Sequence, residues 1–152
     1  MKYGLSFVGL VLVCLSIFVF GKGEKNVSDD YLRIHIIANS NSVEDQKLKY
    51  DVKDTVTQFL SAELKNAQNF EDAKQKIEQN LPKITAISND VLKRKGVSYF
   101  SNCFVSCEEI PARAYDNLVL CGGKYQTLVI KLGDAEGDNW WCVVFPNVCF
   151  AD

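Results

Sequence analysis

Hydrophobic and polar residues alternate from position 31, and this alternation predicts a strand over residues 31–38. Leu32, Ile34 and Ile36 fall on one face of that strand, because successive side chains of a strand point to opposite faces. The other face mixes polar and apolar residues. The asparagine and serine residues at positions 39–42 then end the strand.

Two helical patterns follow the first strand. Apolar residues recur at three- and four-residue spacing from Ser42, which is a good N-cap, to about Lys65. Asn69 caps a second helix, whose apolar stripe continues to the basic residues before Gly96. Pro82 lies inside this second stripe. Because proline lacks an N–H and clashes with the preceding turn, we expect the helix to kink or restart there.

The pattern returns to alternation after the helices. It predicts strands over residues 97–107 and 140–145, and between them a hairpin over residues 118–132 whose turn is a pair of glycines. Residues 110–117 read as irregular. One strand, then helices, then several strands indicate an α+β domain. We expect two layers, with a mostly antiparallel sheet of about four or five strands and two or three helices packed on one face.

Both tryptophans of the chain are adjacent in the predicted closing strand. Trp140 and Trp141 must therefore point to opposite faces of the sheet. One of them can fill the core. The other needs a second covering layer, a partner or water.

The chain begins with an apolar segment that indicates export. Lys2 precedes an uncharged run over residues 3–21. This run is longer than a typical secretory apolar region of about 7–15 residues and close to the roughly 20 residues of a spanning helix. Residues 1–21 are therefore predicted to be a signal peptide or an N-terminal membrane anchor, and an uncleaved segment would contact the membrane. Residues 22–30 read as a tether, and residues 31–152 as a single exported domain.

Charge and cysteine content narrow the function further. The formal net charge of −2, without a basic run, gives no footprint for nucleic acid. An odd number of cysteines follows the apolar segment, so at least one is unpaired or bonded to another chain. A wide turn near Pro146 could bring Cys142 and Cys149 together. Small buried apolar side chains are the alternative for all of these cysteines, which are Cys103, Cys107, Cys121, Cys142 and Cys149.

No catalytic or metal-binding motif accompanies these residues. His35 is the single histidine, and a lone histidine among isoleucines is more often a hydrogen-bonded structural residue than a catalyst. Zinc requires closely spaced cysteine and histidine pairs, which are missing from the sequence. We predict no metal and no cofactor, and we favour an exported binding domain. An exported hydrolase or thiol enzyme that uses His35 and Cys142 is the alternative, and an envelope structural domain is a third reading.

Two stretches of the sequence resemble a known family. The first is residues 33–42 (RIHIIANSNS), continued by Glu44, Asp45, Gln46, Leu48, Lys49, Val52, Lys53 and Asp54. The second is residues 139–146 (NWWCVVFP), continued by Cys149 and Phe150. Together, and separated by helices, they resemble the stage II sporulation protein R family of endospore-forming bacteria. The resemblance covers about residues 31–152.

The resemblance implies a signalling role without catalysis. Proteins of this family are exported from the forespore into the intermembrane space. There they activate a membrane-embedded aspartic protease of the mother cell, stage II sporulation protein GA, which cleaves the precursor of sigma factor E. In this reading the partner is that protease. The residues expected to contact it are His35, Asn39, Ser40, Trp140, Trp141 and Phe145.

Overall fold

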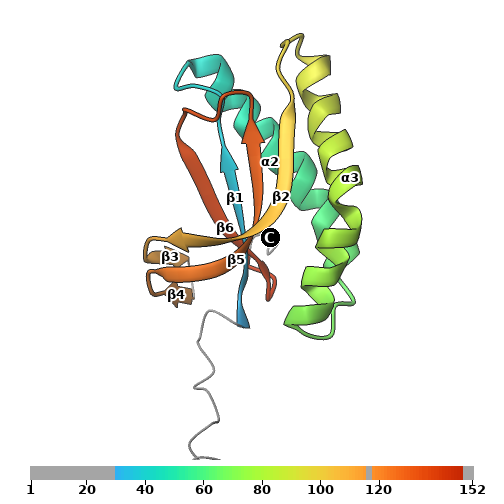
Figure 1. Ribbon diagram of the computed structural model, residues 1–152, viewed down its shortest axis with the longest axis vertical. Helices are drawn as coiled ribbons and strands as arrows, with labels where there is room; N and C mark the ends of the chain where they lie inside the picture. The colour runs from blue at the N-terminus through green and yellow to red at the C-terminus, as the bar shows by residue number, and fades with distance from the viewer. Residues whose placement is uncertain (1–29, 116–117, 149–152) are drawn as a thin grey trace, which may run out of the picture.

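The computed structural model describes residues 30–115 and 118–148, and it has two layers. A four-stranded sheet forms one layer, and two long helices pack against one of its faces (Figure 1). A small two-stranded sheet projects from one end. The elements in chain order are β1 (Leu32–Ile37), α2 (Val43–Leu64), α3 (Phe70–Arg94), β2 (Ser101–Ile110), β3 (Arg113–Tyr115), β4 (Leu118–Leu120), β5 (Gly123–Leu132) and β6 (Asn139–Phe145).

The main sheet has the strand order β2-β5-β1-β6. The pairs β2–β5 and β1–β6 are antiparallel, whereas β1 and β5 run parallel. The sheet is therefore mixed with mostly antiparallel pairs, and the predicted α+β class is confirmed. The first strand therefore lies inside the sheet, between β5 and β6.

The predicted hairpin over residues 118–132 is wrong. β4 pairs with β3 instead, and β5 pairs with β2 in a ladder that extends from Ser101, opposite Leu132, to Ile110, opposite Gly123. This long ladder satisfies many more backbone groups than a short hairpin to β4 could. The glycine pair therefore marks the point where the chain re-enters the sheet. A Cβ atom at Gly122 would lie 3.2 Å from the backbone nitrogen of Ala112, so the β4–β5 connection passes close to the β2–β3 connection.

The core lies between the helices and the sheet. Leu32, Ile34 and Ile36 of β1 are fully buried on the helix-facing side, as their alternation predicts. The helical stripes meet them with Leu48, Val52, Val56, Leu60 and Leu64 from α2, and with Ala73, Ile77, Ile84, Val91 and Leu92 from α3. β5 and β6 add Leu128, Ile130, Leu132, Cys142 and Val144. The predicted two-layer packing is confirmed.

α3 passes through Pro82 without a restart. Proline removes one helical hydrogen bond, but Ile77 and Ile84 on either side of it are completely buried against the core. Tertiary packing of an apolar face supplies most of the stability of a helix in a protein, so it offsets the lost bond. β2 also begins later than predicted, at Ser101, whose backbone N–H donates to Asn89 Oδ1 at 2.7 Å.

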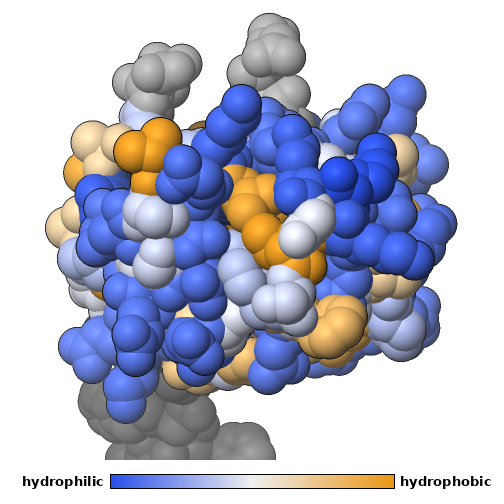
Figure 2. Space-filling view, turned by 90° about the horizontal axis from the view of Figure 1, so that it is seen from above, coloured by the Kyte–Doolittle hydropathy of each residue, from blue (hydrophilic) through white to orange (hydrophobic). Residues whose placement is uncertain are grey.

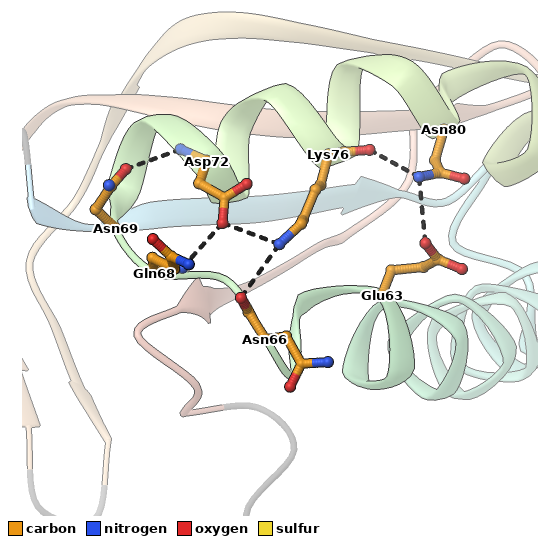
Figure 3. A network of polar contacts seen from close by, with 7 residues as sticks. All are labelled: Glu63, Asn66, Gln68, Asn69, Asp72, Lys76 and Asn80. Carbon is orange, nitrogen blue, oxygen red and sulfur yellow. Dashed lines mark hydrogen bonds and ion pairs between the residues drawn. The ribbon is translucent and has the colours of Figure 1, made fainter.

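A polar network holds the turn between α2 and α3 (Figure 3). Asn69 caps α3 as predicted, because its side chain accepts from the backbone N–H of Asp72 at 2.9 Å. The Asp72 carboxylate accepts from the backbone N–H of Gln68 and from Lys76 Nζ, both at 2.9 Å. Lys76 also reaches the backbone oxygen of Asn66 at 3.3 Å. These bonds fix the antiparallel pair of helices that covers the sheet.

Candidate functional site: a locked corner and the second face of the sheet

The first signature stretch forms a corner between β1 and α2 that is centred on Asp45. This carboxylate is buried and accepts from Asn39 Nδ2 at 2.8 Å, Ser40 Oγ at 2.6 Å and the Tyr99 hydroxyl at 2.5 Å. Its own backbone N–H donates to Ser42 Oγ at 3.1 Å, which completes the predicted N-cap of α2. One helix residue thus joins the end of β1, the start of α2 and the segment before β2.

The same corner holds the loop that leads into β6. Asn39 Oδ1 accepts from the backbone N–H of Asp134 at 2.9 Å, and Asn41 Oδ1 accepts from that of Asp138 at 2.7 Å. The backbones also approach closely, because a Cβ atom at Gly137 would lie 2.2 Å from the backbone oxygen of Ser40. Viewed from above, onto the end of the domain where these loops lie, the surface is mostly hydrophilic around a small apolar area (Figure 2).

The hydrogen bonds of the corner favour the charged form of the Asp45 carboxylate. Burial by itself raises the pKa of Asp45, but the hydrogen bonds from Ser40, Tyr99, Asn39 and Ser42 outweigh it and hold the pKa below its ordinary value of 3.8. Burial, followed by the hydrogen bond to the Asp45 carboxylate, raises the pKa of Tyr99, so its hydroxyl remains a donor. The sequence predicts that Asn39 and Ser40 contact a partner. In the structure both side chains are engaged inside the corner.

His35 lies on the second face of the sheet, which is the face opposite the helix-side core. Its Nε2 is 2.7 Å from Asn139 Oδ1, and its Nδ1 is 3.3 Å from Glu108 Oε2. The ring also stacks on Trp141, with ring centroids 5.2 Å apart. The predicted hydrogen-bonded structural role of His35 agrees with these contacts, which join β1 to β2 and β6.

The two tryptophans point to opposite faces, as predicted. Trp140 is partly buried against the helix-side core, and Lys53 of α2 lies over its ring. Trp141 lies on the second face, half-buried between His35 and Arg113, whose guanidinium carbon is 4.6 Å from the ring centroid. Trp141 is therefore the tryptophan on the face of the sheet opposite the helix-side core. Phe145 is partly buried against the core at the end of β6.

The position of Cys142 disagrees with the alternative of a Cys/His enzyme. Cys142 is opposite Ile34 in the β1–β6 ladder and belongs to the helix-side core, whereas His35 occupies the second face. Cys142 is also disulfide-bonded. A thiolate at Cys142 activated by His35 is therefore excluded. Cys149 lies outside the described residues, so the pairing of Cys142 with Cys149 stays a prediction. Cys103, Cys107 and Cys121 are free.

The sequence interpretation missed the cationic and aromatic character of the second face. Arg33 of β1 is fully buried there, beside Tyr125 of β5 and Tyr115 of β3. Arg113, two residues before Tyr115, covers Trp141. The available signal was an arginine between Leu32 and Ile34 in a predicted strand. Tyr115 lies 82 positions from Arg33 in the chain, and no local pattern encodes a contact over that separation.

Two absences concern the described residues only. Within residues 30–115 and 118–148, no three histidine, cysteine, aspartate or glutamate side chains gather as metal ligands. No helix of the same segments is both long and apolar enough to cross a membrane. The predicted signal peptide or anchor at residues 1–21 lies outside them and stays a prediction.

The comparisons with known proteins agree with the two signature stretches. No solved structure matches this chain. Stage II sporulation protein R of Bacillus subtilis (strain 168) is 34% identical over 126 residues, which cover 83% of this chain and 56% of that protein. The chain thus matches little more than half the length of this relative. The family model of stage II sporulation protein R matches residues 28–152. This chain therefore belongs to the stage II sporulation protein R family.

Proposed function

We propose that this chain is an exported developmental signal that activates a membrane-embedded aspartic protease, stage II sporulation protein GA. The activated protease would then cleave the precursor of sigma factor E. The family match over residues 28–152 carries the proposal. The uncharged run over residues 3–21 supports export from the forespore into the intermembrane space.

The second face of the sheet is the surface that best fits a protein partner. It presents Trp141 under the exposed Arg113, and tryptophan and arginine are the residue types most enriched at binding hot spots. In the corner around Asp45, in contrast, the polar side chains form hydrogen bonds with one another. We therefore assign the partner contact to Trp141 and its neighbours, and a structural role to Asn39 and Ser40.

Co-expression in a host that does not sporulate tests the proposal. The host produces the protease and the sigma-factor precursor, with or without this chain, and cleavage of the precursor is followed by immunoblot. We expect cleavage only when this chain is present with residues 1–21 intact. A chain that lacks residues 1–21 serves as the control for export. Equal cleavage with and without the full chain would refute the proposal and leave the envelope structural reading.

A further inference from the structure

Arg33 is a charged residue that is buried without an opposite charge among the described residues. Its side chain is 0% exposed, and a guanidinium keeps its charge at any physiological pH. Nη2 donates to the Tyr115 hydroxyl at 2.5 Å, but Nε and Nη1 are shielded and have no hydrogen-bond partner among the described residues. None of the ion pairs among the described residues includes Arg33. Charged groups are seldom fully buried without a counter-charge.

The described residues around Arg33 attract a cation but supply no opposite charge. The guanidinium carbon is 5.0 Å from the centre of the Tyr125 ring and 5.8 Å from that of the Tyr115 ring. Its register partners on the neighbouring strands, Thr127 and Val143, are fully buried and uncharged. Cation–π contacts stabilise a guanidinium only modestly and leave its N–H donors unbonded.

We propose that Arg33 is the receptor for a carboxylate of the protein partner, an acidic side chain that displaces the Tyr115 hydroxyl. Nη2 shares one edge of the guanidinium with Nε and the other edge with Nη1. A carboxylate that takes the place of the hydroxyl on Nη2 therefore also reaches one of the two unbonded donors. This two-point contact is the strongest hydrogen-bonded pairing available to arginine. The hydroxyl occupies the position where the carboxylate would bind.

The charges of the second face favour an acidic ligand. Arg33 and Arg113 lie on this face, and the Glu108 carboxylate contacts His35, at 3.3 Å from Nδ1. The whole chain has a net charge of −2, so this local excess of basic groups is distinctive. Trp141, which stacks on His35 of the same face, offers an apolar contact to the segment that carries the acid. The proposed function identifies the partner as a protein, and this inference rests on it for that identity alone.

Arginine side-chain resonances provide a direct test of the site. The arginines of the chain are Arg33, Arg94 and Arg113, so an isotope-labelled full chain gives a simple Nε–H spectrum that single variants assign. The probe is a capped peptide with one glutamate between glycines. The controls are the same peptide with glutamine, and free acetate. We expect a saturable shift of the Arg33 signal with the glutamate peptide, little shift with the glutamine peptide, and weaker binding of acetate.

Two variants connect the site to the biological readout. Arg33→Met removes the charge at similar length, and Arg33→Lys keeps the charge but loses the planar fork. We expect both to remain folded in urea titrations and to lower precursor cleavage roughly tenfold or more, as loss of one partner of a buried charge pair does. The matched control is Arg94→Met, which removes an exposed arginine on α3 that pairs with Asp90. It should leave both the cleavage and the Arg33 signal unchanged.

The outcomes separate this inference from the proposed function. No saturable shift at Arg33, or equal shifts with both peptides, would overturn the carboxylate site and leave a buried arginine that holds only internal water. Wild-type cleavage by folded Arg33→Met would overturn it as well. If the wild-type chain triggers no cleavage at all, the proposed function fails, while the peptide titration still decides whether Arg33 binds a carboxylate.

Discussion

Replacement of Asp45 by alanine should cost much more stability than its position in the first turn of α2 suggests. The change removes the acceptor for three side-chain donors, which are Asn39 Nδ2, Ser40 Oγ and the Tyr99 hydroxyl. Hydrogen bonds to a charged group contribute about 1.5–3 kcal/mol each. The corner is only partly buried, and water can bond to released donors. We therefore expect a total loss of about 3–4 kcal/mol, below the sum of three separate bonds.

Glu44 is the matched control. It precedes Asp45, shares the first turn of α2 and is exposed. Alanine at Glu44 removes only a favourable interaction with the helix dipole, about 0.3–1 kcal/mol. Urea unfolding at neutral pH, followed by circular dichroism, measures both variants. With a denaturant slope of about 2 kcal/mol per molar, the Asp45→Ala midpoint should fall by roughly 1.5–2 M. A midpoint close to that of Glu44→Ala would refute the structural role of the corner.

Three further predictions concern the corner and the second face. Asp45→Asn should lose less stability than the wild type as the pH falls below about 4. The lowered pKa of Asp45 in the folded state stabilises the wild type at pH values above 3.8, and protonation of the carboxylate removes this stability. Urea unfolding of both chains over a range of acid pH measures the difference. Gly137→Ala should cost about 2–3 kcal/mol of stability because the new Cβ meets the Ser40 backbone. Gly123→Ala is the control, because its nearest contact is at 4.0 Å and its stability should change little. Equal urea midpoints for the two variants would contradict this. Trp140→Ala should lower the melting temperature and precursor cleavage together, whereas Trp141→Ala should reduce cleavage with a smaller thermal effect; equal thermal losses would remove the basis for a partner role of Trp141.

The sequence was sufficient for features that repeat along one element. The stripes of α2 and α3, the buried face of β1 and the opposite directions of Trp140 and Trp141 all follow from local periodicity, and the structure confirms them. The caps at Ser42 and Asn69 were predicted for the same reason, since a cap is a local interaction.

Contacts between residues far apart in the chain could not be predicted from the sequence. The glycine pair near position 122 looks like a hairpin turn, but the ladder of β5 with β2 satisfies more backbone groups and determines the topology. Tyr99 bonds Asp45 across 54 positions, and Tyr115 bonds Arg33 across 82. Local periodicity carries no information about such pairs. The residues of the second face could therefore be recognised individually but not as a group.

The two signature stretches are parts of one structure, which changes how loss-of-function variants in the first must be interpreted. Asn39 and Asn41 hold the backbone of the loop before β6, at Asp134 and Asp138. β6 then pairs with β1 so that Trp141 is opposite His35. Release of the corner would free the start of β6 and move Trp141 without touching any partner. Variants at Asn39 or Ser40 that abolish activation would thus be expected even if neither residue contacts the protease. Cleavage restored at a lower temperature, where the corner refolds, would identify this indirect effect.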